Sequence, residues 1–261
     1  MLEFSGMSTL NYILIFTFIG SLGGLIGGLA LISKEEFAKK ISHFLASFAA
    51  GVFLGAAFFD LLPEASHNAE ELGINIFTWT LIGIIFFFLL ERFVHWFHHH
   101  DEHHGHSVEP KSTIPLIVIG DTVHNFVDGI VIAATFLVGA PLGIITALAV
   151  FAHEIPQEIG DFGLLLHKGL ARRTIILINV LSASVAFIGA LLTYALGNAL
   201  KSYIPTLLAL TAGFFIYIAT SDLIPEINYE KDRRSALIKS LLLVLGIGVI
   251  MLSVSLLEHG K

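Results

Sequence analysis

Eight long apolar stretches constrain this sequence more than any other feature. Each has about 20 residues or more, the length that an α-helix needs to cross a hydrocarbon core about 30 Å thick. The strands of a membrane β-barrel would show alternating segments of about ten residues, and these stretches are too long and too uniformly apolar for that. The sequence therefore predicts an all-α membrane protein with eight transmembrane helices. They cover residues 9–32, 41–62, 74–97, 114–138, 141–166, 173–197, 203–225 and 236–257.

The composition agrees with a membrane protein and excludes several other classes. Hydrophobic residues make up 55% of the chain and charged residues 13%, against about 45–50% and about 25% in soluble domains. The sequence has no cysteine, which excludes disulfides and thiolate metal ligands. The first residues lack the basic region of a signal peptide, so we expect the first apolar stretch to remain as a membrane helix. The net charge of −7 does not favour nucleic acid as a partner.

Lysine and arginine are distributed unequally between the two sets of loops. Of the 14 Lys and Arg residues, 12 lie in or beside the loops that follow the first, third, fifth and seventh stretches. The opposite side holds only Lys201 and Lys261. Because cytoplasmic loops carry an excess of Lys and Arg, we expect the richer side to be cytoplasmic and both termini to lie outside. The prediction is a single transmembrane domain over residues 1–261.

Two segments of the chain repeat each other at a constant spacing of 162 residues. They are AGVFLGAAFFDLLPE, Ala50 to Glu64, and AGFFIYIATSDLIPE, Ala212 to Glu226, with 8 of 15 positions identical. In the topology above, the second stretch runs outward and the seventh runs inward, so the copies are inverted. Inverted repeats around a midplane site are typical of secondary transporters. We expect helices 1–3 and 6–8 to form the two copies around helices 4 and 5.

Polar and charged residues gather in these two central stretches. The fourth contains DTVHNFVDG, residues 121–129, and the fifth contains HEIPQEIGD, residues 153–161. An ionisable side chain at mid-bilayer costs about 2.5–3.5 kcal/mol, so it needs a functional reason or a buried partner. Positions i, i+3 and i+4 share one face of a helix. His124 therefore lies beside Asp128, and His153 shares a face with Gln157 and Asp161.

Two facing helices that each offer an imidazole and an acid can bind a divalent metal through nitrogen and oxygen. Pro156 predicts a kink that leaves the carbonyl of Ala152 without its helical partner, and broken helices expose carbonyls to transported ions. The alternative is a set of interhelical hydrogen bonds, which is a poor match to so dense and acidic a cluster. For Asp121 and Glu158 taken singly, both interpretations stay open.

The motifs HNFVDG and HEIPQEIGD together resemble the paired signature of the ZIP (Zrt/Irt-like) metal transporter family. They are most similar to the branch with HNF-x-DG and HE-x-P-H-E-x-GD. Eight spans, outside termini and a histidine-rich loop after the third span also fit, so the resemblance covers the whole chain. It implies a transporter of divalent metal ions rather than an enzyme, with a binuclear metal centre between the fourth and fifth helices.

The resemblance also implies which residues bind metal. Carried over by motif position, the first site consists of His124, Asp128, His153 and Gln157. The second consists of Asn125, Asp128, Glu154 and Gln157, with Asn179 of the sixth helix as a further ligand. Asp128 bridges the two sites, and Asp60 resembles an acid of the family's outer entrance.

Gln157 departs from the branch, in which this position is often His. A glutamine offers a neutral carbonyl oxygen and is a poorer zinc ligand than an imidazole. The metal preference, and the occupancy of two sites at once, therefore depend on this position.

A histidine-rich tract follows the third stretch, in the loop at about residues 95–113. The sequence HWFHHHDEHHGH, residues 95–106, has seven histidines in twelve positions. Short histidine-rich tracts bind metals, so we expect this cytoplasmic loop to collect released ions or to sense their level. The alternative is a flexible linker with incidental metal affinity.

The sequence thus predicts an importer of Zn²⁺, with Fe²⁺, Mn²⁺ and Cd²⁺ as alternative substrates and no prosthetic group. HEIPQ also resembles the H-E-x-x-H motif of zinc proteases, which makes an intramembrane zinc metallohydrolase one alternative. Gln157 in place of the second His, Pro156 and the inverted repeat oppose it. A proton or non-metal cation exchanger is the other alternative, against which the histidine tract argues. We expect a multi-pass protein of the cell (inner) membrane, embedded in the lipid bilayer, and the resemblance implies a homodimer.

Overall fold

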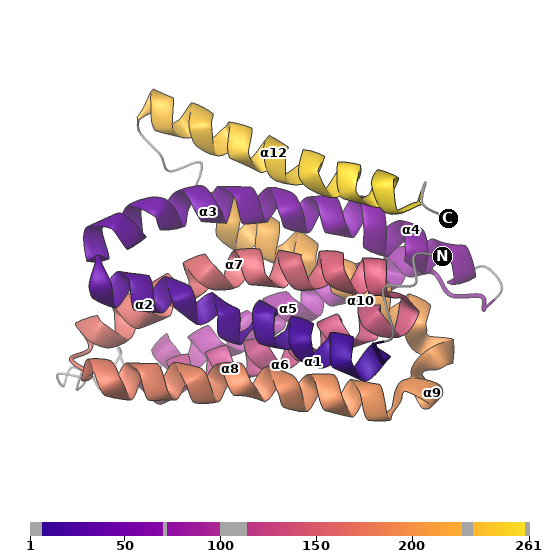
Figure 1. Ribbon diagram of the computed structural model, residues 1–261, viewed down its shortest axis with the longest axis horizontal. Coiled ribbons are helices and arrows are strands. Elements are labelled where there is room, and N and C mark those ends of the chain that lie inside the picture. Colours follow the sequence, from indigo (N-terminus) through magenta and orange to yellow (C-terminus); the bar gives the residue numbers. More distant parts are fainter. Residues whose placement is uncertain (1–6, 70–71, 100–113, 226–231, 259–261) are drawn as a thin grey trace.

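The computed structural model of the chain describes residues 7–69, 72–99, 114–225 and 232–258. All regular elements of these residues are helical. Figure 1 shows the long helices running side by side, with their connections at two opposite ends. The elements are α1 (Thr9–Gly20), η1 (Leu22–Leu25), α2 (Ile26–Ser33), α3 (Glu35–Ala56), η2 (Ala57–Leu61), α4 (Leu62–Ala69), α5 (Ile76–His99), α6 (Ile114–Val138), α7 (Ala140–His167), α8 (Arg172–Ala195), α9 (Gly197–Leu200), η3 (Lys201–Tyr203), α10 (Ile204–Tyr217), η4 (Ile218–Leu223) and α12 (Arg233–Glu258).

The all-α membrane fold expected from the sequence is confirmed. Within the part of the chain that the structure describes, seven helical segments are long and apolar enough to cross a membrane by length and composition. The remaining predicted span, the third in chain order, corresponds to α5, in which the apolar stretch Ile76–Leu90 is shorter. The two labelled chain ends lie at the same end of the bundle (Figure 1), as an even number of crossings requires. Which end faces outward stays a prediction.

Two of the spans contain a π-helical turn, and the two turns occupy corresponding positions of the repeat. They are η2 (Ala57–Leu61) and η4 (Ile218–Leu223), and a shift of 162 residues superimposes most of one on the other. Each precedes a proline, Pro63 or Pro225. Proline has no N–H and its ring pushes on the carbonyl four residues earlier, and a wider turn accommodates both effects. The repeat therefore extends from sequence to local backbone.

The packing of the first and sixth spans also follows the repeat. A Cβ added at Gly27 would meet the carbonyl oxygen of Ile155 in α7, and one added at Gly189 would meet that of Phe126 in α6. Gly27 and Gly189 are again 162 residues apart. Small residues allow helices to approach this closely. The α2–α7 contact in one copy thus corresponds to the α8–α6 contact in the other.

In the outer helices, corresponding glycines of the two copies also make corresponding close contacts. Gly51 of α3 lies against the backbone of α12 at Leu243, and its counterpart Gly213 of α10 lies against the backbone of α5 at Thr80. The corresponding residues Phe53 and Phe215 contact each other, with ring centroids 4.4 Å apart. The predicted arrangement of two copies around α6 and α7 therefore agrees with these contacts, and the Phe53–Phe215 pair lies where the copies meet.

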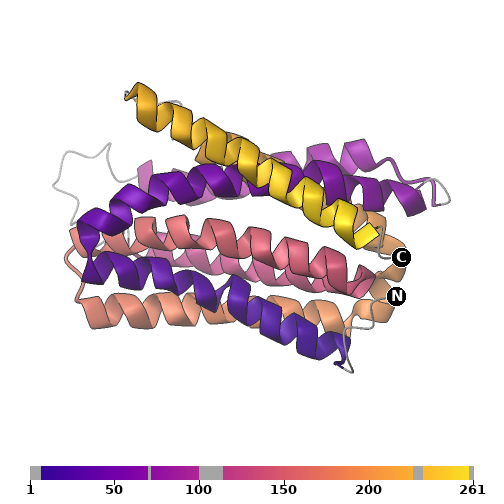
Figure 2. The same cartoon turned by 45° about the horizontal axis from the view of Figure 1, so that its top comes forward.

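Much of one buried core lies on the α6–α7 connection side of Asp128 and His153, and a second buried core joins α2, α7 and α8. The first core includes Ile132 and Phe136 of α6, Ile145 and Val150 of α7, and Ile13 of α1. All five side chains are at most 4% exposed. In Figures 1 and 2, α12 lies on the outside of the bundle against α3. Only 17% of the apolar stretch of α12 is buried within the chain, so most of this helix is left to face lipid.

Candidate metal centre

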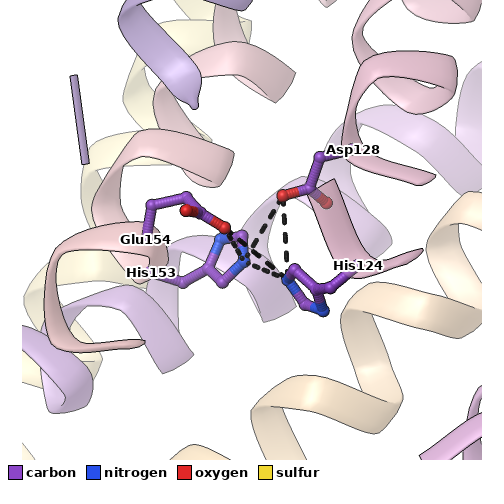
Figure 3. Close-up of side chains that lie close together, drawn as sticks. All are labelled: His124, Asp128, His153 and Glu154. Carbon is purple, nitrogen blue, oxygen red and sulfur yellow. Dashed lines mark hydrogen bonds and ion pairs between the residues drawn. The ribbon is translucent and has the colours of Figure 1, made fainter. Parts of the chain in front are cut away.

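Four side chains of α6 and α7 bring their ligand atoms together between the two helices (Figure 3). They are His124 and Asp128 of α6 and His153 and Glu154 of α7, and one ligand atom from each lies within 4.8 Å of all the others. The two imidazole Nε2 atoms are 2.9 Å apart. Asp128 Oδ2 lies 3.7 Å from both of them. Glu154 Oε1 lies 3.7 Å from His124 Nε2 and 3.5 Å from His153 Nε2.

These separations fit the edges of a metal-centred tetrahedron. Zinc binds imidazole nitrogen and carboxylate oxygen at about 2.0–2.2 Å, so neighbouring ligand atoms of a tetrahedral site lie about 3.3–3.6 Å apart. Four of the five distances, at 3.5–3.7 Å, lie within or just above that range, and the 2.9 Å between the two Nε2 atoms lies below it. For both Nε2 atoms to bind one cation, each ring must carry its proton on Nδ1. The set therefore provides two nitrogen and two oxygen ligands around one point.

Local helix geometry explains how the four side chains meet. His124 and Asp128 are four residues apart on α6 and lie one above the other on the same face. On α7, His153 is 2% exposed and Glu154 is fully buried. Among the described residues, Asp128 Oδ2 and both Glu154 carboxyl oxygens have no hydrogen-bond partner. Because an unpaired buried carboxylate is costly, a cation at the centre of the cluster would offset that cost.

Aromatic rings cover the histidines from the neighbouring helices. The ring of Phe53 in α3 lies 4.7 Å from that of His153, between centroids, and the edge of Phe87 in α5 meets His124 at 5.7 Å. Phe53 is fully buried and Phe87 is 6% exposed. These rings exclude water from one side of the cluster, so charges there interact through a medium of low polarity.

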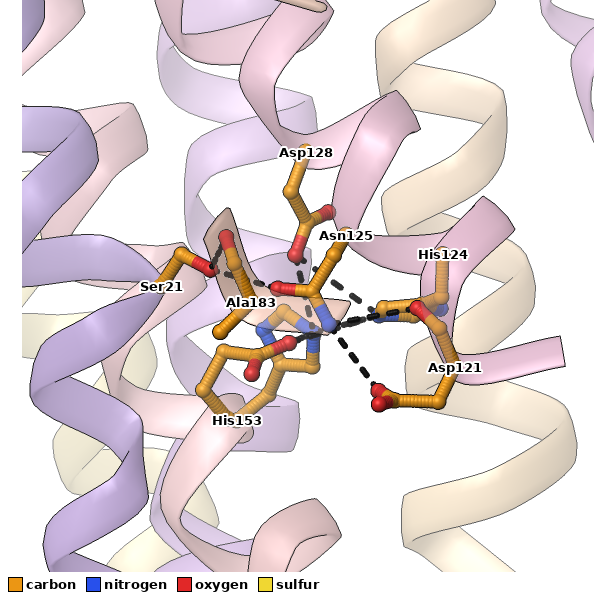
Figure 4. A network of polar contacts seen from close by, with 8 residues as sticks. Ser21, Asp121, His124, Asn125, Asp128, His153 and Ala183 are labelled. Carbon is orange, nitrogen blue, oxygen red and sulfur yellow. Dashed lines mark hydrogen bonds and ion pairs between the residues drawn. The ribbon is translucent and has the colours of Figure 1, made fainter. Parts of the chain in front are cut away.

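A second polar network adjoins the cluster at Asn125 (Figure 4). Ser21, at the break between α1 and η1, donates its hydroxyl proton toward Asn125 Oδ1 at 2.5 Å and also lies 2.9 Å from the carbonyl oxygen of Ala183. Asn125 Nδ2 donates to Asp121 Oδ1 at 2.9 Å. Both ends of the Asn125 amide are thus engaged. The network holds the break in the first span against α6 and α8.

A cavity of about 440 Å³ leads from the histidines to one end of the bundle. His124 and His153 line its inner end, and Leu164 of α7 and Ile117 of α6 line it closer to the helix ends. On the other side of the cluster lies much of the first buried core described above. The cluster is therefore reached from one end of the bundle, the end where the sequence places most Lys and Arg residues.

Comparison with known proteins places the chain in a family. The model of the ZIP zinc transporter family matches residues 8–115 and 111–254. The chain belongs to the ZIP zinc transporter family. This confirms the resemblance drawn from the two motifs. The family consists of transporters, so the prediction that the chain is not an enzyme is also supported by the match, against the hydrolase alternative.

Several ZIP relatives match the chain over part of its length. Human zinc transporter ZIP10 is 38% identical over 144 residues, 49% of this chain and 17% of that protein. Human zinc transporter ZIP4 is 42% identical over 119 residues, 46% of the chain and 18% of that protein. Zinc transporter foi of Drosophila melanogaster is 37% identical over 167 residues, 59% of the chain and 23% of that protein. The chain thus spans about a fifth of the length of these ZIP relatives.

The predicted ZIP site residues fall into three groups in the structure. His124, Asp128, His153 and Glu154 form the cluster, and Glu154 is as close to the histidines as Asp128 is, although the resemblance assigned it to the second site. Gln157 lines the cavity beside both histidines, and Asn125 lies next to the cluster in the Ser21 network. Asn179 is buried and donates to the carbonyl of Ile175 in its own helix, and Asp60 lies in η2.

The predicted kink at Pro156 and the role of the histidine-rich loop stay predictions, and the hydrogen bonds of Asn125 were not predicted. Pro156 lines the cavity, and α7 continues past it from Ala140 to His167, so the kink stays a prediction. The greater part of the histidine-rich loop, residues 100–113, lies outside the described residues. Ser21 was not predicted from the sequence, because its contact with Asn125 joins residues 104 positions apart. The four-residue spacing of Asp121 and Asn125 could have indicated their hydrogen bond.

Proposed function

We propose that this ZIP protein carries divalent transition metal ions across the membrane, Zn²⁺ most readily, through the cluster of His124, Asp128, His153 and Glu154. The observation that carries the proposal is a set of two imidazoles and two carboxylates that converge at the closed end of a cavity. The ZIP relatives, which are named zinc transporters, support the same substrate. Imidazole together with carboxylate suits zinc and its neighbours in the first transition row.

The binding groups have distinct roles in this proposal. The two imidazoles select a transition metal over Mg²⁺ or Ca²⁺, because hard ions prefer oxygen ligands only. The two carboxylates neutralise the charge of the ion in an apolar layer. Asp128 is also the residue that a second ion would share, with Asn125, Glu154, Gln157 and Asn179 as its other ligands. The neutral Gln157 makes that second ion the more weakly bound of the two.

The proposed direction is from outside to the cytoplasm. The distribution of Lys and Arg predicts that both termini lie outside and that Asp60 lies near the outer end of its span, and the cavity then opens to the cytoplasm. An ion would approach past Asp60, bind at the cluster, and leave through the cavity toward the histidine-rich loop. The inverted repeat supports alternating access, in which the copies rearrange around α6 and α7.

Uptake of radioactive zinc into proteoliposomes tests the proposal. We expect the unmodified chain to accumulate zinc with time and His153→Ala to show no more uptake than empty liposomes. His167→Ala is the matched control, since it removes the same side chain from the exposed end of the same helix. It should transport as well as the unmodified chain.

Two outcomes would overturn the proposal. One is zinc uptake by His153→Ala equal to that of the unmodified chain. The other is a failure of the unmodified chain to move zinc, iron, manganese or cadmium while it remains monodisperse and helical by circular dichroism.

A further inference from the structure

One buried hydroxyl group, at the break in the first span, has no part in the function proposed above. Ser21 is the C-cap of α1, where η1 begins, and it is fully buried. Its Oγ lies 2.5 Å from Asn125 Oδ1 and 2.9 Å from the carbonyl oxygen of Ala183. Both neighbours are acceptors, and a serine hydroxyl has a single proton to donate. Ser21 can therefore bond strongly to only one of them at a time.

The side-chain amide of Asn125 has a defined orientation in this network (Figure 4). Its Nδ2 donates to Asp121 Oδ1 at 2.9 Å and to the backbone carbonyl oxygen of Asp121 at 3.2 Å. A flipped amide would place its own carbonyl oxygen against these two acceptors, so Oδ1 has to face Ser21. The one atom of the Asn125 side chain that can bind a metal ion therefore accepts the Ser21 proton.

The repeat provides this hydroxyl group in one copy only. The glycine contacts of α2 with α7 and of α8 with α6 relate α6 to α7 by 29 residues, the spacing that also separates the two histidines. Asn125 therefore corresponds to Glu154, and Ser21 corresponds to Ala183, 162 residues further on. Alanine has no hydroxyl, and both carboxyl oxygens of Glu154 have no hydrogen-bond partner among the described residues. Of two corresponding ligands, Glu154 is left open to an ion and Asn125 is held by a hydrogen bond.

We propose that Ser21 is a positioning residue that controls when Asn125 binds the second ion. The inference rests on the proposed function, in which Asn125 is a ligand of that ion. The hydroxyl hydrogen and a cation both bring positive charge to the same oxygen, and they repel each other strongly where water is scarce. When the second ion binds, the hydroxyl of Ser21 turns to the carbonyl oxygen of Ala183, so its proton keeps a partner. The ion-bound state then has a hydrogen bond between corresponding residues of the two copies.

Zinc binding to the purified protein in detergent, followed by isothermal titration calorimetry, tests this role. Ser21→Ala removes the competing proton. We expect the second equivalent of zinc to bind about two- to tenfold more tightly, as the net contribution of one hydrogen bond implies. The first equivalent should bind as in the unmodified chain. A merely structural role of Ser21 predicts the opposite sign, because a lost buried contact would loosen Asn125 and weaken its bond to the ion.

A second pair of variants shows whether Ser21 acts through Asn125. Asn125→Ala alone should weaken the second equivalent of zinc. In the Asn125→Ala background, Ser21→Ala should have no further effect, because residues in one hydrogen-bond network have coupled effects. Ser21→Gly makes the same removal at a helix end, where glycine is tolerated, and should bind the second equivalent more tightly in the same way as Ser21→Ala.

Ser182 of α8 offers a matched control. It is 3% exposed, and its Oγ lies 3.0 Å from Thr122 Oγ1 of α6, which is not a candidate ligand. Ser182→Ala thus removes a buried hydroxyl from the neighbouring interface, and both zinc equivalents should bind as in the unmodified chain.

Three results would overturn the role of Ser21. One is an unchanged or weaker second equivalent in both Ser21→Ala and Ser21→Gly, and another is an equal gain from Ser21→Ala with and without Asn125. The third is the binding of only one equivalent of zinc to the unmodified chain and to Ser21→Ala. Loss of zinc uptake in His153→Ala would stand in each case, so transport through the cluster and the role of Ser21 fail separately.

Discussion

At the scale of single residues, Asp128 is the most informative position of the candidate metal centre. Its Oδ2 lies 3.7 Å from both imidazoles and has no hydrogen-bond partner among the described residues. Replacing it with alanine would remove one ligand and half of the negative charge that compensates a bound ion. The helix would lose little, because alanine favours helical backbone.

We expect Asp128→Ala to lower the initial rate of zinc uptake by at least about tenfold, since changing even the groups that orient a metal ligand costs 10–100-fold in affinity or activity. Proteoliposome uptake measures the effect, and circular dichroism checks the fold. Glu36→Ala serves as a control at an exposed position. Undiminished uptake by Asp128→Ala would show that Asp128 does not bind the ion.

Gln157 is the residue expected to set metal preference. It lines the cavity beside His124 and His153. The only atom of its side chain that can bind a metal ion is the carbonyl oxygen. Gln157→His adds a third imidazole, and we expect zinc to compete better against Mn²⁺ in uptake assays, because imidazole suits zinc and oxygen suits manganese. If the competition profile of Gln157→His matches that of the unmodified chain, Gln157 is not a ligand.

At the scale of helices, the contact between α3 and α12 depends on Gly51. A Cβ at this position would overlap the carbonyl oxygen of Leu243, whereas a Cβ at Gly248 of α12 would have no described heavy atom within 4 Å. Gly51→Ala should therefore force the helices apart and destabilise the protein by about 1–3 kcal/mol, the usual cost of overpacking. Gly248→Ala should have no such effect.

Thermal unfolding in detergent checks this difference. The expected result is a lower midpoint for Gly51→Ala and an equal or higher midpoint for Gly248→Ala, because alanine has the better helix propensity. Equal midpoints for both variants would mean that α12 is not held by its close approach to Gly51.

At the scale of the whole molecule, the orientation in the membrane is the prediction with the widest consequences. Because the sequence has no cysteine, single cysteines can be introduced without a background. Lys201 and Lys168 lie on opposite sides in the predicted topology. We expect a membrane-impermeant maleimide to label Lys201→Cys in intact cells, and Lys168→Cys only after permeabilisation. The reverse labelling pattern would invert the proposed direction of transport.

The fold could be predicted from the sequence because each span depends on a local property, its uninterrupted hydrophobicity. All eight predicted spans correspond to helical segments. The repeat was visible for the same reason, since Asp60 and Asp222 lie in matching strings of residues. The π-helical turns η2 and η4 were not predicted, although both prolines that accompany them stand in the repeat.

The candidate site was only partly predictable. Spacing along α6 and α7 put His124 with Asp128, and the family resemblance supplied the rest of the ligand set. Neither could reveal that Glu154 lies as close to the histidines as Asp128 does, because this depends on the distance and rotation between two helices. The Ser21–Asn125 hydrogen bond depends on the packing of the first span and has no local signal in the sequence.

The contact between Phe53 and Phe215 joins corresponding residues of the two copies, and it has a thermodynamic consequence. If the copies exchanged their conformations, the same two rings would rebuild the contact, so it stabilises both end states equally. Within the repeated helices, only positions at which the copies differ, such as Gly55 against Tyr217, can give one end state a lower free energy than the other. A bias of tenfold needs only about 1.4 kcal/mol. Very few substitutions could therefore reverse the side on which the empty carrier rests, while the ion gradient would still decide the direction of net flow.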